Sequence, residues 1–120
     1  MMFGLHVNRY HSKAKDSITK HIIAAKASAK KSSGFEITAA QIFICNPRGK
    51  KIIMTPHDQE ELRDYVINEG VVVFAHNSYV INPFIDTQVL GSSSGQIPDN
   101  IEAIHQQLIV CHNSGIDGLV

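Results

Sequence analysis

The chain has 120 residues, of which 43% are hydrophobic, so it is long enough for one small domain with a core and its composition argues against disorder. Its formal net charge is zero, and its apolar runs are too short to span a bilayer. No signal-peptide pattern opens the chain, and Cys45 and Cys111 lack the spacing of a zinc site or a disulfide scaffold. We therefore expect a protein of a reducing compartment that is not secreted.

Charge is unevenly distributed along the chain. Residues 1–51 contain ten Lys or Arg and two Asp or Glu, whereas residues 52–120 contain one Arg and nine Asp or Glu. The excess of lysine between positions 13 and 31 is typical of a solvated helix face. The alternative interpretation is a surface that binds phosphate groups.

The first half of the chain predicts two strands separated by a helix. Residues 2–7 form a short apolar strand candidate, and a helix from about 17 to 33 is ended by Gly34. Residues 39–45 form a second, buried strand. The turn at 46–49 follows directly, because its proline and glycine both interrupt regular structure.

A second helix is predicted with clear boundaries. Thr55 can cap it, Pro56 occupies the first helical position, and Asp58 is placed to complete a capping box. Gly70 ends this helix, and residues 71–75 then form a third buried strand.

A third helix is predicted between a cap at Asp99 and Glu102 and an end at Gly115, followed by a strand at 116–120. We expect its buried face to be an apolar stripe formed by Ile101, Ile104, Leu108 and Cys111.

The predicted order, β-α-β-α-β-α-β, indicates an α/β fold with a parallel sheet and right-handed crossovers. The strands are continuous apolar runs, so we expect both faces of the sheet to be covered. A doubly wound domain and half of a (β/α)₈ barrel both fit this pattern. The last predicted strand has no loop after it, which favours a fragment of a larger domain.

Several residues that could carry chemistry follow the strands at the carboxyl edge, where parallel α/β folds place their sites. His76 is the leading candidate for a metal ligand or a general base, and His6 should lie at the same edge. Arg48 could contact phosphate, and Tyr79 with Val80 could form a wedge into stacked bases. Each residue also has a purely structural interpretation. His76 could simply hydrogen-bond a backbone carbonyl, and His6 could pack at the strand end. Arg48 could be an exposed turn residue, and the loop with Tyr79 and Val80 could fold back on the protein.

These residues fall in segments that resemble the endonuclease IV family of apurinic/apyrimidinic endonucleases, and the viral members in particular. The resemblance covers nearly all 120 residues, and its third segment is the most specific. The matching segments are Gly4-Leu5-His6-Val7, Ala40-Gln41-Ile42-Phe43 with Asn46-Pro47-Arg48, and Ala75-His76-Asn77-Ser78-Tyr79-Val80-Ile81-Asn82.

The resemblance implies a (β/α)₈ TIM-barrel type of fold, of which residues 1–120 would be the amino-terminal part of a single domain. It implies a zinc cluster at the carboxyl face, with His76 as a ligand, and cleavage of DNA 5′ to an abasic site in base excision repair. Arg48, Tyr79 and Val80 would lie in loops that enter the minor groove. Family members are much longer, so further ligands would lie beyond Val120 and these residues alone should be inactive.

Two other functions remain compatible with the sequence. One is a metal-dependent sugar isomerase or epimerase, because that barrel superfamily also places metals at the carboxyl face. The other is a non-catalytic half barrel that binds DNA, a partner chain or a copy of itself through exposed strand edges. The expected location is the cytoplasm or nucleus, or the virion or host cytoplasm for a viral protein.

Overall fold

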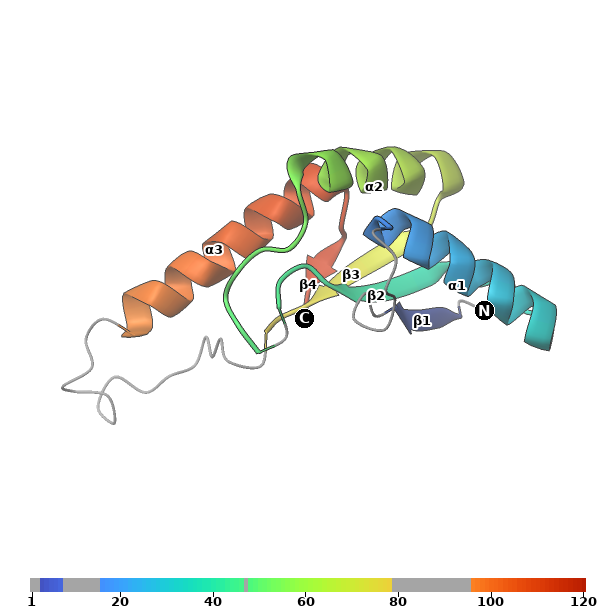
Figure 1. The fold of residues 1–120 in the computed structure, drawn as a ribbon, viewed down its shortest axis with the longest axis horizontal. Helices are drawn as coiled ribbons and strands as arrows, with labels where there is room; N and C mark the ends of the chain where they lie inside the picture. The colour runs from blue at the N-terminus through green and yellow to red at the C-terminus, as the bar shows by residue number, and fades with distance from the viewer. Residues whose placement is uncertain (1–2, 8–15, 47, 79–95) are drawn as a thin grey trace.

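The computed structural model describes residues 3–7, 16–46, 48–78 and 96–120, and there it confirms the predicted order of elements (Figure 1). The strands form one parallel sheet in the order β1-β2-β3-β4. No helix in the described ranges is long and apolar enough to cross a membrane. The elements are β1 (Gly4–Val7), α1 (Ile18–Ser33), β2 (Ala39–Phe43), α2 (Pro56–Glu69), β3 (Val72–His76), α3 (Gln96–Ser114) and β4 (Gly118–Leu119).

The ends of α1 and α2 are set by local interactions that the sequence predicts. The side chain of Ser17 accepts a hydrogen bond from the backbone of α1, and the side chains of Thr55 and Asp58 form a reciprocal capping box at the start of α2. Gly34 and Gly70 adopt the left-handed conformation, with φ of 76° and 65°. This conformation suits glycine and stops each helix.

The capping box gives a first testable prediction. Replacing Thr55 with alanine should lower the free energy of unfolding by about 1 kcal/mol, because one backbone N–H of α2 then loses its acceptor. Urea denaturation followed by circular dichroism measures this change. Glu60→Ala, at an exposed position of the same helix, is the matched control and should leave the urea midpoint nearly unchanged.

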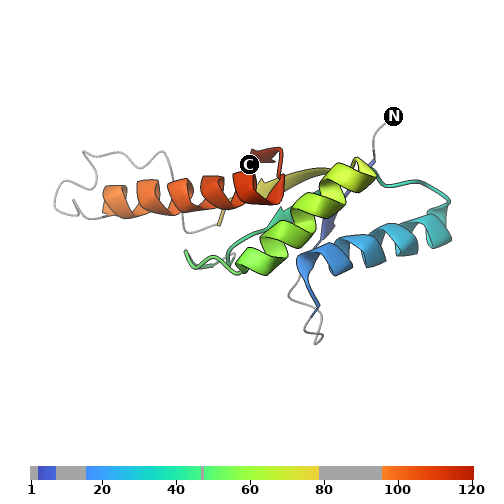
Figure 2. The same ribbon diagram turned by 90° about the horizontal axis from the view of Figure 1, so that it is seen from above.

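All three helices pack on one face of the sheet, as the two ribbon views show (Figures 1 and 2). Alternate strand residues turn toward the helices and are buried there. The opposite face carries no helix within the described ranges, and Phe74 and His6 are exposed on it. The main residues of the core are Val7, Ile18, Ile22, Ala40, Ile42, Leu62, Val73, Ala75, Val110 and Cys111.

This arrangement corrects one expectation and decides between two folds. The expectation that both faces would be covered is wrong for the described residues, because the continuous apolar runs hide an alternation between a fully buried face and a partly open one. A doubly wound sheet carries helices on both faces, so that alternative is also wrong for this part of the chain. Helices on one face of a parallel sheet fit part of a barrel.

The buried face of α3 differs from the predicted apolar stripe. The helix begins at Gln96, earlier than predicted, and Ile101 and Leu108 are 62% and 51% exposed. Polar residues spaced seven apart take their place in the interior. Asn100, Gln107 and Ser114 are buried beside Val110 and Cys111. The prediction holds for Cys111 and is wrong for Ile101 and Leu108, because it assigned burial by hydrophobicity, whereas the amide of Gln107 is buried where it has hydrogen-bond partners inside the protein.

Candidate functional site

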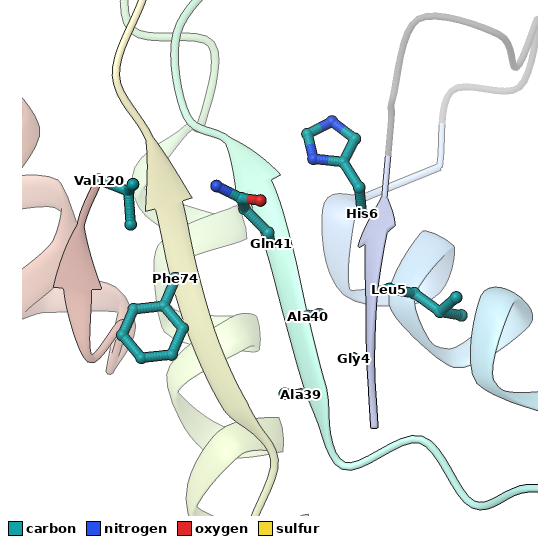
Figure 3. Close-up of a pocket in the computed structure, with 8 residues that line it drawn as sticks. All are labelled: Gly4, Leu5, His6, Ala39, Ala40, Gln41, Phe74 and Val120. Carbon is teal, nitrogen blue, oxygen red and sulfur yellow. The ribbon is translucent and has the colours of Figure 1, made fainter. Parts of the chain in front are cut away.

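Two histidine rings flank a phenylalanine at the carboxyl edge of the sheet. His76 ends β3 and pairs in register with Phe43 of β2, whereas His6 pairs with Gln41. The ring centroids of His6 and Phe43 are 5.4 Å apart, and those of Phe43 and His76 are 5.0 Å apart. The register places all three rings on the face that carries no helix, and Figure 3 shows His6 there beside Gln41. The structure therefore brings together the two histidines that the sequence placed at this edge.

The hydrogen bond made by His76 determines what its ring can do. Its Nδ1 lies 2.6 Å from the carbonyl oxygen of Asn77. A carbonyl only accepts, so Nδ1 carries the proton and the lone pair of the neutral ring resides on Nε2. The hydrogen bond expected for a purely structural histidine is thus present. It is also the bond by which metal-ligating histidines fix their tautomer, so the two interpretations are compatible.

A buried polar network lies directly behind this edge. The side-chain amide of Gln107, in α3, donates from Nε2 to Oδ1 of Asn77 at 2.8 Å and accepts at Oε1 from the thiol of Cys45 at 3.5 Å. Burial raises the pKa of the Cys45 thiol, and a hydrogen bond from the backbone of Ser78 opposes that shift. Sequence analysis missed Gln107, because a glutamine between apolar helix positions is more typical of a solvated face.

The predicted DNA-contacting residues are only partly described. Arg48 lies in the turn after β2, and its backbone N–H donates to Oδ1 of Asn46 at 3.0 Å. Arg48 is exposed, so its guanidinium can meet a partner in solution. Tyr79 and Val80 lie outside the described residues and follow Ser78 directly in the sequence.

The lysines near the end of α1 are separate from this site. Gly34 ends α1 on the way to the amino end of β2, so the last turn of α1 lies at the edge of the sheet opposite His76 (Figure 1). Lys30 and Lys26 lie 3.0 Å and 4.0 Å from the carboxylate of Glu36, and the hydrogen bond from Lys30 lowers the pKa of that carboxyl. Part of the basic excess is therefore paired, as expected for a solvated helix face.

The open face of the sheet forms a shallow hollow of about 330 Å³ (Figure 3). Gly4, His6, Gln41 and Phe74 line it, together with Val120 beyond β4. Within the described residues there is no group of three or more His, Cys, Asp or Glu side chains that could hold a metal ion. A catalytic zinc needs about three protein ligands, so these residues can supply only part of such a site.

The chain is similar to viral AP endonucleases. It is 33% identical over 86 residues to the probable AP endonuclease of African swine fever virus isolate Pig/Kenya/KEN-50/1950, and 30% identical over 87 residues to that of isolate Tick/South Africa/Pretoriuskop Pr4/1996. Each match covers 72% of this chain and 26% of the viral protein, so the chain matches about a quarter of the length of these relatives. No protein-family model matches the sequence.

A solved structure agrees with the sequence comparison. The chain superposes on the crystal structure of AsfvAP:AG with a TM-score of 0.79 and 26% sequence identity, over 98% of this chain and 38% of that one. The comparisons confirm the resemblance to AP endonucleases and the α/β fold with its parallel sheet. They also show that the similarity extends over one portion of a larger protein.

Proposed function

We propose that this chain, which is AP endonuclease-like and matches one part of its viral relatives, is the amino-terminal part of a zinc-dependent endonuclease. The complete enzyme would cleave the DNA phosphodiester on the 5′ side of an abasic site. One observation carries the proposal. His76 lies at the carboxyl edge beside Phe43 and His6, and its Nδ1 is bound to a backbone carbonyl, so that in the neutral ring Nε2 carries the lone pair that coordination would use.

The residues at this edge fit a zinc site in chemistry, although they do not complete one. Neutral imidazole is a good zinc ligand, and His76 is the residue that would bind the metal, with His6 at the edge of the site. When bound, zinc would activate a hydroxide and neutralise the charge that develops on the phosphate. The described residues do not complete the ligand set, and the family resemblance implies that most further ligands lie beyond Val120, so the 120 residues by themselves should be inactive.

DNA binding would use the loops at the same edge. The exposed guanidinium of Arg48 suits a phosphate or a groove, because its planar fork presents several donors. Tyr79 and Val80 would supply the wedge that opens the lesion, as the family resemblance implies. An exposed cationic turn suits the phosphate backbone of DNA better than a neutral sugar, so the DNA substrate is the better supported of the two.

Two surfaces that are exposed among the described residues support the proposal of a single, larger (β/α)₈ barrel. The hollowed face of the sheet would become the barrel interior, and the exposed apolar residues of α3, Ile101 and Leu108, would meet a neighbouring helix.

The two cysteines are unpaired and buried, which fits a reducing compartment such as the cytoplasm or nucleus.

A chimera would test this function. The matching portion of the African swine fever virus protein is replaced by the present chain, and the product is assayed on a duplex with one abasic site. We expect zinc-dependent incision 5′ to the lesion, lost with a chelator and restored by added zinc.

The specificity of the incision separates the alternatives. An intact duplex of the same sequence should remain uncut, and free sugars should not compete with the abasic duplex. A well-folded, zinc-loaded chimera that leaves the abasic duplex uncut would contradict the proposed function. Strong competition by sugars would favour the isomerase alternative.

A further inference from the structure

The amide of Gln107 connects three elements at the point where β2 and β3 end. It belongs to α3, it has 0% exposed surface, and it bonds Asn77 after β3 and Cys45 after β2. A buried amide costs free energy unless its donor and acceptor both find partners, and here the two ends of the amide are used in different directions. The side chain of Gln107 therefore links α3 to the ends of β2 and β3 through two hydrogen bonds.

The link from Gln107 to the end of β2 is made by Cys45. Its thiol donates to Oε1 of Gln107 at 3.5 Å, and its sulfur also accepts a hydrogen bond from the backbone of Ser78, the second residue after β3. Cys45 and Ser78 are both buried, so water does not compete for these hydrogen bonds. The turn at residues 76–78 is thus tied to α3 on one side and to the end of β2 on the other.

Gln107 is linked to His76 through Asn77. The side chain of this residue is held by Gln107, and its carbonyl oxygen accepts from Nδ1 of His76. The backbone N–H of Asn77 also donates to the carbonyl of Val120 at 2.7 Å, which joins the same turn to the end of β4. The position of Asn77 therefore sets both the tautomer of the imidazole and the direction of its Nε2.

We propose that Gln107 is a positioning residue for the carboxyl-edge site, which it controls by holding Asn77 and, through Cys45, Ser78 beneath His76. The role of the site in metal binding rests on the proposed function. The positioning itself concerns only the ring and the turn, and it is measurable without metal. The amide would keep Nε2 of His76 aimed into the site before any ligand arrives, so that binding does not have to order the ring.

The test uses the metal-free 120-residue chain and two nuclear magnetic resonance measurements. The ¹⁵N shifts of the His76 ring report its tautomer, and amide hydrogen exchange reports the opening of the turn at Ser78. In Gln107→Met, which keeps the volume and removes both hydrogen bonds, the Nδ1–H tautomer should give way to a mixture. Exchange at Ser78 should accelerate about tenfold or more relative to the amides of β2.

Gln106→Met is the matched control. Gln106 is the residue of α3 that precedes Gln107, it is exposed, and its amide donates to the carboxylate of Glu102 at 2.7 Å on the surface. This variant should keep the tautomer and the exchange pattern of the parent. A loss of stability alone would speed exchange in β2 and at Ser78 together and would not shift the tautomer, so the two measurements separate positioning from a general packing role.

A second pair of variants covers the case in which Gln107→Met does not fold. Cys45→Ser keeps a donor and an acceptor and should preserve protection at Ser78, whereas Cys45→Ala removes both and should lose it. An unchanged His76 tautomer and unchanged Ser78 exchange in folded Gln107→Met, or equal Ser78 protection in the two Cys45 variants, would overturn the inference. The incision assay tests His76 as a ligand, so the proposed function and the positioning role can fail separately.

Discussion

Replacing His76 with alanine should lower the rate of abasic-site incision by the chimera more than about a hundredfold, because loss of an outer-shell partner of a metal ligand already costs about 10- to 100-fold. His76 is the zinc ligand of the proposed site, and its ring is held by the Asn77 carbonyl and packed beside Phe43. Initial rates on an end-labelled abasic duplex measure the effect. Zinc content of the purified protein, determined in parallel, should fall.

The control for this substitution is His105→Ala. His105 is an exposed residue of α3 and is not among the residues at the carboxyl edge. We expect its incision rate to stay within about threefold of the parent chimera. A His76→Ala chimera that retains a rate in this range, with its zinc content unchanged, would show that His76 is not a metal ligand.

The largest effect on stability should come from Leu62→Ala, which we expect to lower the free energy of unfolding by about 2 to 5 kcal/mol. Leu62 has 0% exposed surface and belongs to the core cluster between α2 and the sheet. Truncation removes transfer free energy and leaves a cavity that the packed neighbours fill only in part. Within the described residues one face of the sheet is uncovered, and so small a domain has little stability in reserve, so much of the chain should be unfolded without denaturant.

Urea denaturation of the 120-residue chain measures this loss. Ile67→Ala is the matched control, because Ile67 lies in the same helix and is 68% exposed. Its substitution should change the free energy of unfolding by no more than about 0.5 kcal/mol. Equal midpoints for the two variants would mean that α2 does not pack on the sheet through Leu62.

The candidate site was predictable in outline, because the carboxyl ends of neighbouring parallel strands meet at one edge. His6 and His76 lie at the carboxyl ends of β1 and β3, so their proximity required only the order of elements. Phe43, whose ring lies between theirs, is brought to the site by the register of β2, and no pattern in the sequence marks it as a site residue. Gln107 lies far along the chain, and no local pattern marks an amide whose partners come from two other elements.

The sequence by itself determined where α1 and α2 begin and end, since their caps and stops are local. Thr55 and Asp58 fix the start of α2 whatever surrounds it, and Gly70 ends the helix because of its own backbone freedom. Only the tertiary structure decided which face of each element is buried. Apolar residues outnumber the places in the core, so Leu108 remains exposed and Gln107 is buried where hydrogen-bond partners meet it.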